Sequence, residues 1–192
     1  MCRHRRTRTL IALVLITSLL FSYTSTLAAA EATLSEFIVT NTRDHLLIYF
    51  RINGCFTPEM DEAILNGIPT TFTILIRLYR TRSFWFDETI TSLGIEHTIK
   101  YDALRNEFRV TRSEANDGDT VFKNFAAAKK AMAEIKNIPV ASLSSLRKHM
   151  KYQLRVKAEL EKVRLPLFLH YVFFFVSLWN FETDWYTIDF TY

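Results

Sequence analysis

Residues 150–161 alternate apolar and polar side chains with a period of two residues. The apolar members of this alternation are Met150, Tyr152, Leu154, Val156, Ala158 and Leu160. Because successive side chains of a β-strand point to opposite faces, the pattern predicts a strand with one face in a core and the other in water. A strand of this kind needs antiparallel neighbours and a second layer to cover its apolar face.

The same period occurs in several other segments. In residues 71–82 the apolar face consists of Phe72, Ile74, Ile76 and Leu78. Turn-forming residues at 41–44 and 102–106 separate two further pairs of short apolar runs, which predicts two hairpins. The additional expected strands are residues 34–40, 46–53, 95–101, 107–112 and 185–192.

Two helices are expected between these strands. Thr57 is a good N-cap, Pro58 suits the first helical position, and Asn66-Gly67 ends the pattern, so residues 58–65 are predicted to be helical. A second helix is predicted to begin after Asp119 or Thr120 and to run to Lys136. Its apolar stripe is interrupted by Lys129, whose aliphatic stem is expected to pack there while its amine reaches water.

Six or seven antiparallel strands with two or three helices predict a mainly β or α+β fold, specifically an antiparallel β-sandwich-like domain. We expect residues 31–192 to form a single domain. With 49% hydrophobic residues, a segment of this length has enough apolar surface for one core.

The first thirty residues have the layout of a secretory signal peptide. Four arginines lie in the first eight residues, an apolar run of twelve residues follows from Leu10 to Phe21, and Ala28-Ala29-Ala30 ends the segment. As a helix the apolar run spans about 18 Å, which is less than a bilayer core of about 30 Å. We expect residues 1–30 to be a signal peptide and the chain to be exported to the periplasm. An uncleaved membrane anchor is the alternative.

Charge and composition exclude several functions. Beyond residue 30 the chain has twenty basic and twenty acidic side chains, so the basic excess expected of a nucleic-acid-binding protein is missing. The histidines are widely spaced, the only two cysteines are Cys2 and Cys55, and the chain has four glycines. The sequence therefore predicts no metal site, no cofactor and no phosphate-binding loop.

Residues 165–181, LPLFLHYVFFFVSLWNF, are strongly apolar and aromatic. Three placements are open: core of the domain, partly exposed contact surface, or a membrane-spanning C-terminal segment. As a helix the segment would reach about 26 Å. The expected interaction surface combines this segment with the other tryptophans. Its residues are Trp85, Trp179, Trp185, Phe173, Phe174 and Phe175.

An enzymatic alternative rests on acids beside tryptophans. Asp87 follows Trp85, and Glu182 and Asp184 precede Trp185. Paired carboxylates next to aromatic platforms are typical of glycoside hydrolases, so a hydrolase acting on envelope glycans is a second hypothesis. The first hypothesis is a non-enzymatic periplasmic module that binds an envelope protein or a lipid surface through its aromatic residues.

Several short strings occur in a familiar order: LNGIPTTF at 65–72, RLYR at 77–80, WFD at 85–87, IKYDAL at 99–104, LPL at 165–167 and WNFETDW at 179–185. Together with the strand at 152–160 they resemble the bacterial family of exported proteins known as domain of unknown function 4390. The resemblance implies an envelope protein of unassigned activity, encoded in some bacteria beside a membrane histidine kinase. A membrane sensor kinase is therefore an expected partner, and no catalytic or binding residues carry over from the family.

Overall fold

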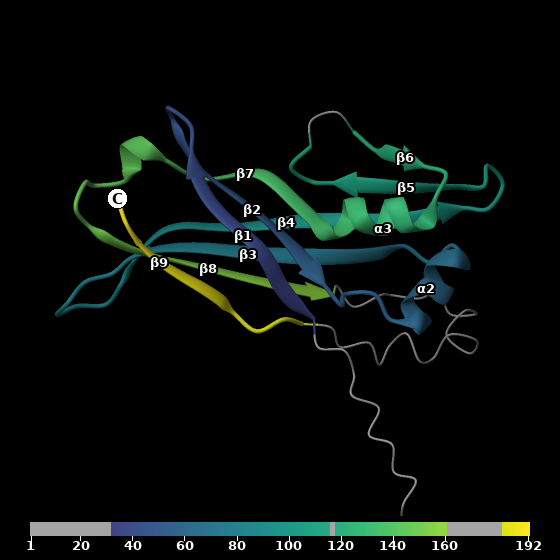
Figure 1. Ribbon diagram of the computed structural model, residues 1–192, viewed down its shortest axis with the longest axis horizontal. Helices are drawn as coiled ribbons and strands as arrows, with labels where there is room; N and C mark the ends of the chain where they lie inside the picture. The colour runs from purple at the N-terminus through teal and green to yellow at the C-terminus, as the bar shows by residue number, and fades with distance from the viewer. Residues whose placement is uncertain (1–31, 116–117, 161–181) are drawn as a thin grey trace, which may run out of the picture. The chain divides into compact units, whose positions relative to one another are not determined.

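The computed structural model describes residues 32–115, 118–160 and 182–192. Contacts group residues 31–192 as one compact unit. In its described part, nine strands form two antiparallel sheets (Figure 1), which confirms the mainly β fold expected from the sequence.

The smaller sheet has the strand order β1-β2-β7, and the larger has the order β6-β5-β4-β3-β8-β9. The strands of the smaller sheet are β1 (Thr33–Asn41), β2 (His45–Asn53) and β7 (Glu134–Ser142). Those of the larger sheet are β3 (Thr70–Arg80), β4 (Glu88–Asp102), β5 (Glu107–Arg112), β6 (Thr120–Phe122), β8 (Lys151–Leu160) and β9 (Tyr186–Thr191).

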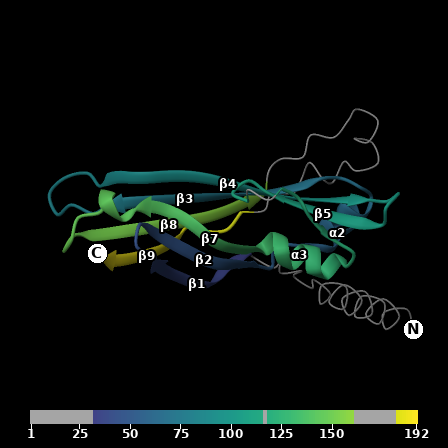
Figure 2. The same ribbon diagram turned by 90° about the horizontal axis from the view of Figure 1, so that it is seen from above.

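The core lies between the two sheets. Strands β2, β3 and β8 each bury every second side chain, as their alternating sequences predict. The buried residues of both sheets belong to one hydrophobic cluster, with Ile48, Ile76 and Val156 completely buried. In Figure 1, β1 and β2 run obliquely across the strands of the larger sheet, and Figure 2 shows the two layers from above.

Helix α2 (Pro58–Leu65) has the predicted bounds. The Thr57 side chain accepts a hydrogen bond from the backbone N–H of Met60, as an N-cap residue should. Met60, Ala63 and Ile64 are the buried residues of α2. The sequence therefore determines this helix through its capping residues as well as its apolar face.

Helix α3 (Phe125–Ala133) is shorter than predicted, because the expected helix at 119–136 is wrong at both ends. Residues Thr120–Phe122 form β6, and Asn124 caps α3 by accepting from the backbone N–H of Ala127. From Glu134 the backbone is extended and pairs with β2. This β7 strand was missed because Pro139 and its irregular burial obscure the period of two. As an edge strand of its sheet, β7 tolerates that proline.

An aromatic stack connects the edge strands of the two sheets. In β1 the register shifts between Ser35 and Ile38, and Glu36 has a positive φ of 52°, which marks a β-bulge. Phe37, beside the bulge, stacks on Phe50 at 5.2 Å and on Tyr186 of β9 at 5.0 Å. Tyr186 thereby ties β9 to β1 without a backbone ladder between them.

The predicted signal peptide and the aromatic segment 165–181 lie outside the described residues. Within the described ranges, no helix combines the length and apolar character required to cross a bilayer.

The elements divide between two ends of the described domain. The β3–β4 loop, the segment between β7 and β8, and the end of β9 lie together at one end in both Figure 1 and Figure 2. Helices α2 and α3 and the β4–β5 turn lie at the opposite end. Backbone hydrogen bonds from Thr81 to Lys151 and from Tyr192 to Met150 confirm the first grouping.

Candidate functional site

The loop between β3 and β4 exposes three consecutive aromatic side chains. Phe84 is 99% exposed, Trp85 74% and Phe86 87%. None of these rings stacks on another ring or under a cation in the described structure. Contiguous exposed apolar side chains mark contact surfaces in soluble domains. We call residues 84–86 the aromatic tip.

Charged residues brace the base of the aromatic tip. Arg80 and Arg82 both donate to the carboxylate of Glu88, and the backbone N–H of Arg82 donates to Asp87 Oδ1 at 3.2 Å. Desolvation opposes ionisation of Glu88, but its hydrogen bonds and charge interactions with the two arginines outweigh it and lower its pKa. The acids and bases within the loop thus satisfy one another.

A basic segment without acids adjoins the aromatic tip. Residues 143–151 contain Arg147, Lys148 and Lys151 and no Asp or Glu, and these three residues are exposed. Within the described chain, none of the three forms an ion pair. The segment is attached to the tip because the backbone N–H and the hydroxyl of Thr81 both donate to Lys151 O at 3.0 Å. We call residues 147–151 the basic loop.

The basic loop is held at both ends. The buried Tyr152 side chain accepts a hydrogen bond from the backbone N–H of Arg147 at 2.7 Å. The backbone N–H of His149 donates to Tyr192 O, at the end of β9. Met150, which the sequence pattern placed on the core face of β8, is instead 41% exposed, because the strand begins one residue later.

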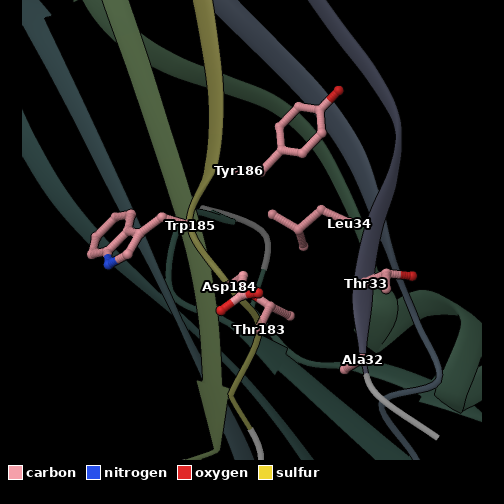
Figure 3. Close-up of a pocket in the computed structure, with 7 residues that line it drawn as sticks. All are labelled: Ala32, Thr33, Leu34, Thr183, Asp184, Trp185 and Tyr186. Carbon is pink, nitrogen blue, oxygen red and sulfur yellow. The ribbon is translucent and has the colours of Figure 1, made fainter.

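Trp185 occupies a different environment from Trp85. It is 38% exposed, and the Arg77 guanidinium lies 4.9 Å from its ring centroid. In Figure 3 its ring lies on the opposite side of the chain from Leu34 and Tyr186. The two tryptophans lie near different parts of β8. Trp185 is next to Tyr186, which pairs with Val156, whereas Trp85 belongs to the loop that is bonded to Lys151 through Thr81. The five residue steps from Lys151 to Val156 span roughly 17 Å of strand. Trp179, Phe173, Phe174 and Phe175 lie outside the described residues.

Asp87 lies far from the other two acids proposed for hydrolysis, Glu182 and Asp184. The Glu182 carboxylate binds Lys157 Nζ at 2.8 Å. The backbone of Glu182 forms an isolated antiparallel β-bridge with that of Glu159, near the end of β8. Asp87 lies beyond the other end of β8, at the base of the aromatic tip. Asp87 therefore cannot share one glycosidic bond with Glu182, because two carboxyl groups within about 10 Å are needed.

A cavity of about 310 Å³ lies where the chain enters β1 and β9 (Figure 3). Its lining residues are Ala32, Thr33, Leu34, Thr183, Asp184, Trp185 and Tyr186. Asp184 is the single carboxylate among them, and Thr183 already bonds the backbone of Ala158 through both its N–H and its hydroxyl. The cavity thus lacks the second acid of a hydrolase.

At the opposite end of the domain, the histidine His97 is completely buried and fully hydrogen-bonded. Its Nδ1 lies 2.8 Å from Met132 O, and its Nε2 lies 2.8 Å from Glu114 Oε1. A carbonyl and an ionised carboxylate only accept hydrogen bonds, so both nitrogens of the ring face acceptor oxygens. Burial works against ionisation of Glu114, but His97 and then Arg112 outweigh it and lower the pKa of this carboxyl.

The described residues contain no other group of obvious reactivity. Cys55 is buried, and burial raises the pKa of its thiol to about 12, so it is a packing residue and not a nucleophile. Lys129 packs between the rings of Phe125 and Phe56 while its amine binds Asp61 at 2.7 Å. No set of three or more His, Cys, Asp or Glu residues in this part of the chain is arranged to hold a metal ion.

Sequence reasoning identified Trp85 but missed its neighbours. Phe84 and Phe86 lie between two strands, so three aromatic residues in a loop without a core partner were a readable signal. The basic loop was not singled out, because its three cations are distributed over five residues and belong to the site only through their proximity to Thr81.

Comparison with known proteins identifies the family of the chain. The model of the family described as Domain of unknown function (DUF4390) matches residues 29–189. The chain therefore belongs to this family. No curated protein and no solved structure matches it.

Proposed function

We propose that this member of the DUF4390 family is a non-enzymatic interaction module of the cell envelope that contacts its target through the aromatic tip. The exposure of Phe84, Trp85 and Phe86 carries the proposal. Three large rings kept in water lower the solubility of a monomer, and their removal would leave every hydrogen bond of the loop intact. Residues with a cost and no structural role are best explained by a contact.

The proposed location is the periplasm. The basic, apolar and small-residue parts of residues 1–30 support export. A membrane sensor kinase encoded near members of such a family is one candidate partner, and the membrane surface itself is another. Both would be reached by an exported domain that presents a protruding apolar loop.

Photo-crosslinking in cells tests the use of the tip. A photoreactive phenylalanine analogue replaces Phe86 in one variant and Leu104 in a matched control. Leu104 is 99% exposed in the turn between β4 and β5, at the opposite end of the domain. We expect a specific adduct, whether protein or lipid, from position 86 and none from position 104.

Two outcomes would contradict the proposal. One is equal labelling from positions 86 and 104, because the tip would then have no preferred target. The other is recovery of the chain from the cytoplasmic fraction after osmotic release of the periplasm, which would contradict export.

A further inference from the structure

We infer that the target of the aromatic tip is an anionic phospholipid bilayer, whose headgroups are bound by the basic loop while the tip enters the apolar layer beneath them. The inference rests on the proposed function and specifies its partner. It is carried by the arrangement of two independent segments, residues 84–86 and 147–151, at one end of the domain.

The length of the β3–β4 loop matches the depth of the contact that we infer. The last paired residues of the hairpin are Arg80 and Glu88, so seven loop residues project beyond the sheet. Half of such a loop spans about 12 Å when extended. Side chains of interfacial segments are buried about 5–10 Å into the boundary between headgroups and acyl chains. The tip therefore reaches this depth while the ends of β3 and β4 stay outside.

The residue types of the aromatic tip suit the interface of a bilayer. Tryptophan prefers the boundary between headgroups and acyl chains, because its ring is apolar and its indole N–H keeps a polar partner. Phe84 and Phe86 flank Trp85 and add apolar surface on both sides. The two arginines closest to them, Arg80 and Arg82, are balanced by the two carboxylates of Glu88 and Asp87, so the base of the loop carries no net charge into the contact.

The positive charge of the basic loop is complementary to an anionic lipid surface. Arg147, Lys148 and Lys151 have no acid within their segment and no ion pair in the described chain. Each basic side chain close to an anionic surface increases affinity about fivefold, so three increase it about a hundredfold. A zwitterionic surface offers no such gain.

The placement of the basic groups relative to the aromatic tip favours a bilayer over a protein pocket as the target. The apolar and basic groups are on different segments, and Thr81 fixes the basic loop at the root of the tip and not at its end. Charge at the base and apolar surface at the end match a target whose charged layer covers an apolar layer. A bilayer has this order over its whole surface.

The experiment uses the complete chain with Trp179→Phe and Trp185→Phe, so that Trp85 is its single tryptophan. Vesicles of phosphatidylethanolamine and phosphatidylglycerol carry brominated acyl chains, which quench indoles that enter the bilayer. We expect the Trp85 emission to shift to shorter wavelength and to be quenched. With vesicles of phosphatidylcholine alone we expect neither change. Because the signal is local to position 85, other membrane-binding segments of the chain do not produce it.

Two matched controls accompany this protein. A chain with Trp85→Phe and Trp179→Phe reports from Trp185, which should not be quenched, because it is stacked with Arg77 on the sheet. In the second, three lysines in or beside other elements are changed to Gln in the Trp85 protein: Lys123 between β6 and α3, Lys130 in α3 and Lys136 in β7. The corresponding test variant changes Arg147, Lys148 and Lys151 to Gln and has the same net charge.

We expect the basic-loop variant to need about a hundredfold more lipid for half-maximal quenching, and the control variant to need no more than the parent. Unchanged Trp85 emission with anionic vesicles would overturn the inference, as would equal quenching by phosphatidylcholine. If position 86 yields a protein adduct under those results, the proposed function survives and its target is that protein. If both experiments fail, the proposed function fails too.

Discussion

The paired strands β3 and β4 have unusual side chains at both ends, with apolar rings exposed to water at one end and polar groups buried at the other. Beyond Arg80 the hairpin places three aromatic side chains in water. Roughly 26 Å away, where Phe72 pairs with His97, β4 buries the imidazole of His97 beside the partly buried carboxylate of Glu114. Each arrangement is unfavourable when considered alone, but only one of them is compensated by contacts within the domain.

The buried pair is compensated. Both ring nitrogens of His97 have partners, and the pKa of the Glu114 carboxyl beside it is lowered. Oε1 of this carboxyl lies against the ring, while its Oε2 is buried without a hydrogen-bond partner among the described residues. These bonds join β4 to the end of α3 and to the segment after β5, so the pair stabilises the fold. The aromatic tip has no such partners in the described structure. The comparison teaches that unsatisfied apolar exposure indicates a contact with another molecule, whereas satisfied polar burial indicates a structural role.

The largest effect on stability is expected from His97→Ala. It removes both hydrogen bonds and leaves the Glu114 carboxylate without its partner, so we expect the free energy of unfolding to fall by about 3 kcal/mol. Urea denaturation measures the change. His45→Ala is the matched control, because the exposed His45 has no side-chain hydrogen bond, and its effect should stay within about 0.5 kcal/mol. Equal effects would mean that the buried pair does not stabilise the fold.

The pH dependence of stability tests the ion pair itself. Because the folded-state pKa of Glu114 is lowered, its contribution is fully present above its ordinary value of 4.5 and is lost as the pH falls through the lowered value. Glu114→Gln should cost about 1.5 kcal/mol at neutral pH and flatten the acid limb of the stability profile. Denaturation midpoints at a series of pH values show this. An unchanged acid limb in the variant would contradict the assignment.

The two described tryptophans offer a smaller and more discriminating test. Trp185→Ala should destabilise the domain by about 1 kcal/mol, because the ring loses its contact with the Arg77 guanidinium. Trp85→Ala should leave the free energy of unfolding unchanged. Thermal or urea unfolding of both variants, compared with the parent chain, separates the structural tryptophan from the exposed one. Equal destabilisation by the two substitutions would count against the distinction.

The smallest expected effect on stability belongs to the whole tip. Simultaneous Phe84→Ser, Trp85→Ser and Phe86→Ser substitutions should alter the free energy of unfolding by no more than about 0.5 kcal/mol, because all three rings are solvent-exposed. The same protein should aggregate less at high concentration, as measured by light scattering. A loss of several kcal/mol would show that the tip packs on the domain.

Much of the fold was predictable because its information is local. The alternation of apolar side chains identified which residues of β2, β3 and β8 are buried, apart from Met150, and the Thr57 cap with Pro58 determined α2. The elements that were wrong depend on long-range pairing. Strand β7 extends along β2 despite Pro139, and β6 is a three-residue strand paired with β5. Neither has a period long enough to be read from the chain alone.

The site was partly predictable for the same reason. Trp85 stood out by residue type, but its exposure and that of its neighbours follow from the length of the hairpin beyond Arg80. The proximity of the basic loop depends on the hydrogen bonds between Thr81 and Lys151, which are seventy residues apart. Trp185 shared its residue type with Trp85 and not its environment, which only the strand pairing reveals.

The most direct test of the central claim is the depth of Trp85 in an anionic bilayer, compared with that of Trp185 in the same protein background. Quenching by brominated phosphatidylglycerol should be strong for Trp85 and absent for Trp185. If Trp185 is quenched as strongly as Trp85, or if Trp85 remains in water, the aromatic tip is not the membrane contact of this domain.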